Sequence, residues 1–129
     1  MDTIESIRKA KRKAAELADT TLSLVNSKEI DTASSYYLKA LEEVGRIKIL
    51  QDNPADEIAK NKGTFVENAD RVMQEAKDSR IQAALAYLVR ENEGSCVVKN
   101  GTQFMIRKDV PDSELNRAVV SLKTNLAFL

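Results

Sequence analysis

Residues 31–77 read DTASSYYLKALEEVGRIKILQDNPADEIAKNKGTFVENADRVMQEAK, and this stretch decides the fold. Apolar residues recur every three or four positions in residues 31–50 and again from Pro54 onward, which places them on one face of each of two helices. Asn53 is predicted to cap the second helix, and Pro54 suits its first turn because an N–H has no helical partner there. A connection this short favours an antiparallel pair.

Length and composition indicate one mainly α-helical domain. The 129 residues are enough for a single hydrophobic core, and the scarcity of proline (two) and glycine (four) favours long helices. We predict a single domain over residues 1–129, with a three-helix antiparallel bundle in residues 1–77. A further helix, a small β-hairpin and a C-terminal helix in residues 78–129 are expected to pack on this bundle.

Charge and cysteine content indicate the environment of the protein. Twenty basic and twenty acidic residues cancel, so no overall field attracts nucleic acid or an anionic membrane. Cys96, the lone cysteine, favours a reducing compartment. The sequence shows neither the apolar core of a secretory signal nor a stretch long enough to span a membrane. We therefore predict a cytoplasmic protein.

The patterns around residues 3–50 place the first two helices. An apolar stripe predicts a helix over residues 3–26, which ends at the polar residues that follow. Asp31 is predicted as the N-cap of the next helix, with Ile30 as the hydrophobic residue just outside it. Adjacent residues point about 100° apart on a helix, so Tyr37 is expected inward and Tyr36 toward a groove or the surface.

The last fifty residues change in character. Helical periodicity continues to about residue 91, with a break or kink expected near Asp78-Ser79. Asn100-Gly101 then predicts a turn over residues 99–102, between strands at 95–98 and 103–106. Asp112 or Ser113 is expected to cap a final helix. The predicted core face of this helix comprises Leu115, Ala118, Val119, Leu122 and Leu126.

Basic residues crowd one stretch of the first helix: Arg8, Lys9, Lys11, Arg12 and Lys13. A cluster of this kind is typical of a patch that binds phosphate groups of nucleic acid or of acidic lipid. It also fits a solvated helix face, since Glu5 and Glu16 partly balance it. Both interpretations stay open.

The sequence contains no recognisable catalytic constellation. The absence of histidine excludes Ser-His-Asp and Cys-His arrangements and the usual zinc sites, and no glycine-rich phosphate loop is present. Cys96, between apolar neighbours, is interpreted as a small buried hydrophobe. Glu42 and Glu43 are interpreted as a solvated face. We therefore predict a protein that is not an enzyme and that carries no metal or cofactor.

One family resemblance covers residues 14–77. The residues that carry it are Ala14-Ala15-Glu16-Leu17, Ala33, Tyr37, Ala40-Leu41-Glu42, Ile58, Phe65-Val66 and Ala69-Asp70. This pattern resembles the MIT (microtubule-interacting and trafficking) domain, a three-helix antiparallel bundle. Asn61 and Asn68 depart from it, because the family prefers Lys and Arg at these positions.

The resemblance implies a binding module without enzyme activity. MIT domains receive a short helix or an extended Pro-rich segment from the tail of an ESCRT-III subunit, commonly in a groove between their second and third helices. Apolar anchors supply affinity in such a groove, and charges at its rim fix the register. The positions here that match its lining are Tyr36, Lys39, Glu43, Lys62, Val66, Glu67, Asp70 and Met73. The same polar residues fit a solvated surface, and the same apolar ones fit a core.

Protein binding, as an adaptor, inhibitor or assembly subunit, is the function that we expect. Two alternatives stay open. A small nucleic-acid-binding regulator would use the basic residues of the first helix or the C-terminal hairpin. A helical self-assembling protein, for example of viral type, would form homo-oligomers by burying the apolar end Phe128-Leu129 between copies.

Overall fold

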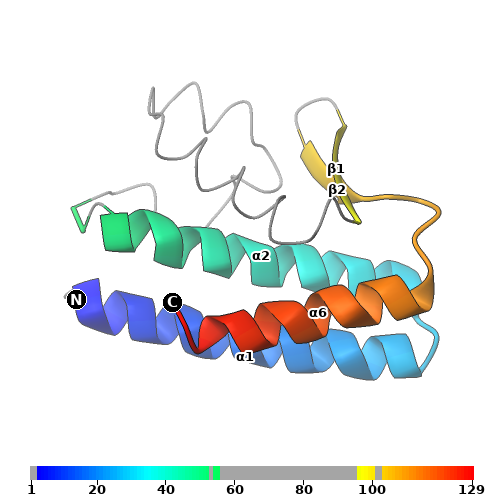
Figure 1. Ribbon diagram of the computed structural model, residues 1–129, viewed down its shortest axis with the longest axis horizontal. Helices are drawn as coiled ribbons and strands as arrows, with labels where there is room; N and C mark the ends of the chain where they lie inside the picture. Colours follow the sequence, from blue (N-terminus) through cyan, green and yellow to red (C-terminus); the bar gives the residue numbers. More distant parts are fainter. Residues whose placement is uncertain (1–2, 53, 56–95, 101–102) are drawn as a thin grey trace.

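Helices dominate the part of the chain that the computed structural model describes, which is residues 3–52, 54–55, 96–100 and 103–129. In chain order the elements are α1 (Thr3–Asn26), α2 (Ile30–Asp52), β1 (Val97–Asn100), β2 (Gln103–Ile106) and α6 (Asp112–Leu126). Figure 1 shows the three helices side by side, with the hairpin against the N-terminal half of α2. The prediction of a mainly α fold with a small hairpin is confirmed.

Small side chains bring α1 and α2 together as an antiparallel pair. Ala10, Ala14 and Ala18 recur every four residues along α1 and are buried. Because alanine has only a methyl group, the two backbones can approach closely, and large residues of α2 fill the remaining space. The α2 residues buried in this core include Ala33, Tyr37, Ala40, Leu41, Val44 and Ile47. The predicted bounds of the first helix are confirmed, and so is the inward position of Tyr37.

Residues 40–45 of α2 are all buried, Gly45 included. Six consecutive residues point in every direction around a helix, so α2 is covered on all sides along these turns. Glu42 and Glu43 are each only 7% exposed, and the prediction that they form a solvated face is wrong. Arg46 lies one turn later and pairs with both carboxylates, at 3.9 and 3.3 Å. Buried carboxylates are tolerated here because a cation from the same helix compensates them.

A turn with a left-handed residue joins α1 to α2. The N–H of Lys28 donates to the carbonyl of Val25 at 3.0 Å, and the N–H of Glu29 donates to that of Leu24 at 2.9 Å. These two bonds form a Schellman motif, which places Lys28 at φ 63°. The N–H of Ala33 donates to the carbonyl of Glu29, so Glu29 occupies the N-cap position of α2.

The prediction of Asp31 as the N-cap of α2 is therefore wrong. Asp31 lies inside the helix, in its first turn. An acidic side chain is favoured in both positions, because it can accept a bond from a free N–H at the cap and complements the helix dipole one turn in. Residue type alone does not separate these two roles.

Lys28→Gly is expected to be more stable than Lys28→Ala. A residue with a Cβ is strained at positive φ, while glycine loses more entropy on folding, and the balance favours Gly over Ala at this position by about 0.5–1 kcal/mol. Lys28→Ala is the matched control, since both variants lose the exposed ion pair with Asp112 and only one keeps the Cβ. Urea denaturation measures the difference. A Gly variant less stable than the Ala variant would contradict the expectation.

α6 lies antiparallel to α1 and is attached along its whole length. Ion pairs tie its first and last turns, where Lys28 pairs with Asp112 at 3.3 Å and Lys123 pairs with Asp19 at 2.5 Å. At the far end the ammonium of Lys11 donates to the carbonyl of Leu129. Between these contacts α6 buries Leu115, Val119, Leu122 and Leu126. The predicted core face of the last helix is confirmed, with Ala118 partly buried beside it.

Pro111 is the N-cap of α6, so the prediction of Asp112 or Ser113 as the cap is wrong. The N–H groups of Glu114 and Leu115 both donate to the carbonyl of Pro111, at 3.0 and 3.1 Å. Proline sits well at this boundary because the cap residue has an extended backbone, here ψ 150°. Asp112 then lies in the first turn, where its negative charge interacts favourably with the helix dipole.

β1 and β2 form an antiparallel hairpin, as predicted. The register pairs Val97 with Ile106 and Asn100 with Gln103. Residues 99 and 100 thus belong to β1, and the predicted four-residue turn over 99–102 is wrong because β1 continues two residues further than predicted. The second strand has its predicted bounds, 103–106. The next helix was predicted to begin at Pro54, but Pro54 and Ala55 form a turn. The rest of that helix lies outside the described residues, as do the Asn53 cap and the helical stretch expected up to residue 91.

Candidate protein-binding groove

A groove of about 560 Å³ lies between the first turns of α2 and the segment that runs from β2 toward α6. Its α2 wall consists of Ile30, Asp31, Ser34, Ser35 and Leu38. Its second wall consists of Met105, Ile106, Arg107, Lys108 and Val110. Some seventy residues of sequence separate the two walls, so only the tertiary fold brings them together.

The groove has an apolar base and a polar rim. Ile30, Leu38, Ile106 and Val110 are partly buried and pack against the hydrophobic core, so their positions are fixed by the fold. The exposed rim residues Asp31, Ser35 and Lys108 carry charge or hydrogen-bonding groups. A preformed apolar cleft of a few hundred Å³ with a small number of polar groups is typical of a ligand site.

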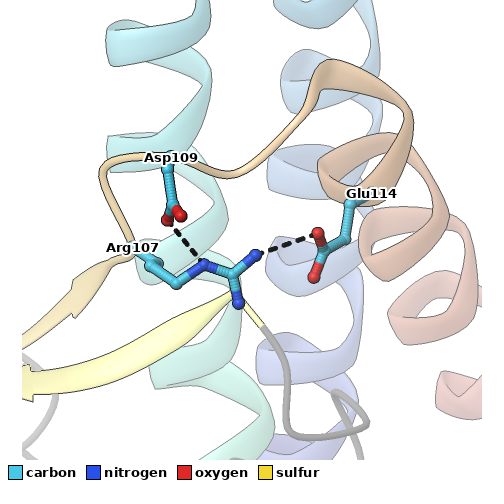
Figure 2. Close-up of polar contacts among 3 residues, drawn as sticks. All are labelled: Arg107, Asp109 and Glu114. Atoms are coloured by element: carbon cyan, nitrogen blue, oxygen red, sulfur yellow. Dashed lines mark hydrogen bonds and ion pairs between the residues drawn. The ribbon is translucent and has the colours of Figure 1, made fainter.

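Arg107 holds the second wall in place (Figure 2). Its guanidinium donates to Asp109 at 2.7 Å and to Glu114, in the first turn of α6, at 3.1 Å. The bond to Asp109 and the negative charge of Glu114 raise the pKa of Arg107 above its ordinary value. One side chain therefore links the end of β2, the connecting loop and α6.

The α2 residues that were predicted to bind a partner lie on a different side of the helix. Tyr36, Lys39 and Glu43 are centred roughly 140° around the α2 axis from the groove residues. The ammonium of Lys39 lies 4.8 Å from the centre of the Tyr36 ring, a cation–π contact. Glu43 is buried and pairs with Arg46 and with Lys13 of α1, at 3.8 Å for the latter.

The other predicted partner-binding residues lie outside the described residues: Lys62, Val66, Glu67, Asp70 and Met73. The structure brings together Tyr36 and Lys39 within this set. The assignment of the whole set to a binding groove stays a prediction.

The basic residues of α1 divide into two groups. Arg8, Lys9 and Arg12 are exposed. Lys11 is engaged with the carbonyl of Leu129, and Lys13 pairs with Glu43. Within the described residues, two of the five cations thus have partners, and nucleic-acid binding by the cluster stays a prediction.

The groove residues were missed at the level of sequence, although one signal was present. Leu38 is apolar but falls outside the buried stripe of its helix, which indicates a second contact on α2. Nothing comparable marks Ser34 or Lys108, which are ordinary surface residue types.

Burial favours the protonated forms of two titratable groups of the core, Cys96 and Tyr37. Cys96 is fully buried, as predicted, and burial raises the pKa of its thiol. Burial also raises the pKa of the Tyr37 phenol, with a further contribution from Cys96. A thiol that resists ionisation is a poor nucleophile. No group of three or more potential metal-binding side chains occurs in the described residues.

None of the helices within the described residues is long and apolar enough to cross a lipid bilayer.

Comparisons with protein-family models, with curated proteins and with solved structures found no match to this chain. The resemblance to the MIT domain therefore stays a prediction.

Proposed function

We propose that this chain is a non-enzymatic protein-binding module that holds a short segment of a partner in the groove between α2 and β2. The observation that carries the proposal is the open groove of about 560 Å³ with an apolar base and a charged rim. Apolar pockets supply affinity for a peptide. Asp31 and Lys108 stand on opposite walls, so their charges favour one orientation of a bound segment.

The proposed role is that of a regulatory adaptor in the cytoplasm. A buried Cys96 thiol is compatible with a reducing compartment, which supports this location. The MIT resemblance adds a second version of the proposal, in which an ESCRT-III tail binds on the side of α2 that carries Tyr36 and Lys39. The two versions use different surfaces of the same helix, so variants separate them.

Selection of random linear peptides displayed on phage, with the full chain as bait, tests the proposal. We expect enriched peptides whose affinity falls at least about tenfold for Ser35→Arg, because this long side chain would enter the groove from its rim. Thr32→Arg is the matched control, since it adds the same charge at an exposed α2 position that does not line the groove.

Other outcomes would contradict the proposal. Absence of enriched peptides would remove it, as would equal binding to both arginine variants. Loss of binding on Lys39→Glu but not on Ser35→Arg would move the site to the MIT-type surface. Tight binding of duplex DNA that collapses with added salt and with removal of Arg8 and Arg12 would instead support the nucleic-acid alternative.

A further inference from the structure

The hydrogen-bond pattern of the hairpin leaves one backbone edge facing outward. The N–H of Arg107 donates to the carbonyl of Cys96 at 2.6 Å, which extends the ladder by one bonded pair beyond Val97–Ile106. Bonded and non-bonded pairs alternate in an antiparallel ladder, so Val97–Ile106 is a non-bonded pair. The N–H and C=O of Ile106 therefore point away from β1, at the outer edge of β2.

The groove meets β2 at the end of this edge, where Met105 and Ile106 line it. Within the described residues β2 pairs with β1 alone, and of the two strands β2 packs more closely on α2. Ile106 is the last residue of β2, and the groove residues Arg107 and Lys108 follow directly after it. An outer edge of this kind is a template for pairing with another extended chain.

The charges beside the edge indicate what kind of chain fits. Arg107 is turned toward Asp109 and Glu114 and is engaged there (Figure 2). Lys108 is exposed at the end of the edge, and Asp31 is exposed on the facing α2 wall. A segment with an acidic residue near Lys108 and a basic residue near Asp31 complements this pair.

We propose that the groove takes an extended partner segment as an added β-strand on the outer edge of β2. Alternate apolar side chains of the segment pack on Ile106 and Leu38, and an acidic side chain lies beside Lys108. This inference rests on the proposed function and selects a strand over a helix as the bound form. Main-chain hydrogen bonds then supply part of the affinity, and alternate side chains supply the specificity.

Backbone methylation of the selected peptides tests the strand directly. We expect methylation of alternate peptide amides to weaken binding at least about tenfold, since two or more main-chain hydrogen bonds are lost. Methylation at the intervening amides, which face away from β2, should have a much smaller effect. Apolar residues should occupy alternate positions of the selected peptides, and each peptide should carry an acidic residue. Replacing this acidic residue by lysine should weaken binding, and Lys108→Glu in the protein should restore it.

A pair of variants tests the same edge on the protein. Ile106→Pro removes the outward N–H without removing a hydrogen bond to β1, and proline is tolerated on an edge strand. Ile106→Ala is the control, because it also loses the side chain but keeps the N–H. Circular dichroism checks that both variants keep their helix content. If the proline variant unfolds, the methylated peptides alone test whether the segment binds as an added strand.

The failure of this inference is distinguishable from the failure of the proposed function. Selected peptides that lose affinity for Ser35→Arg and yet tolerate methylation at every amide would overturn the added strand and leave a groove that binds helices. Apolar residues at helical spacing in the selected peptides would also overturn the added strand. Equal binding to the Pro and Ala variants, both folded, would overturn it too. Absence of any peptide that depends on the groove would overturn both proposals.

Discussion

Leu115→Ala is expected to lower the free energy of unfolding by about 2–5 kcal/mol. Leu115 is fully buried in the first half of α6, and its truncation leaves a cavity where α6 meets the core. Urea denaturation followed by circular dichroism measures the loss. Val120→Ala is the control on the same helix, because Val120 is 46% exposed, and its effect should stay within about 0.5 kcal/mol. A loss below about 1 kcal/mol for Leu115→Ala would mean that α6 contributes little to the core.

The same series tests whether residues 1–129 form a single domain. Ile47 of α2 is also fully buried, and Ile47→Ala should cost an amount similar to that of Leu115→Ala. If the chain is one cooperative unit, each variant shifts one common transition that is seen by every probe. Two separate transitions, each moved by only one of the variants, would show that α6 and the α1–α2 pair unfold independently.

Periodicity made the helices predictable. The buried residues of α1 recur every three or four positions from Ala10 to Val25, and the predicted bounds of this helix were correct. Ile4, in its first turn, is exposed. The core face of α6 was correct for the same reason. The hairpin was predictable from Asn100-Gly101, although the register extends β1 through residue 100.

Helix starts and buried charges were harder to predict, because residue type leaves several roles open. Asp31 and Asp112 both lie in first turns, where a carboxylate is favoured almost as much as at the cap. Lys28 ends α1 at positive φ without the glycine that usually marks this position. Glu42 and Glu43 are buried because Arg46 compensates them, which the composition of the helix does not reveal.

The groove could not be predicted because it belongs to no single segment. One wall comes from α2 and the other from residues 105–110, and neither wall is unusual in composition. Its shape depends on where the hairpin lies on α2, which is a property of the tertiary packing. Sequence patterns act over a few turns of helix or strand, so they locate elements and leave the contacts between distant elements open.

Raising the pH above about 9 is expected to destabilise the protein through two buried groups. Burial raises the pKa of the Cys96 thiol from its ordinary 9.0 and that of the Tyr37 phenol from its ordinary 10.0. A raised pKa in the folded state means that the unfolded state loses its proton first, so stability is complete below the ordinary pKa and falls above it. Each group lowers the free energy of unfolding by up to about 1.4 kcal/mol per pH unit. Urea titrations at a series of pH values from neutral to alkaline measure the slope.

Tyr37→Phe and Cys96→Ala show how much each side chain contributes to the fall of the free energy of unfolding with pH. Cys96→Ala should flatten the first part of the fall, and Tyr37→Phe should flatten the part above about pH 10, because each removes one ionisable group. Near neutral pH, Tyr37→Phe should be neutral or stabilising by about 1 kcal/mol, since the buried hydroxyl has no hydrogen-bond partner within the described residues. A double variant that keeps the alkaline slope of the natural chain would show that other groups cause it. A double variant whose free energy of unfolding does not change at alkaline pH would establish that Cys96 and Tyr37 cause the loss of stability.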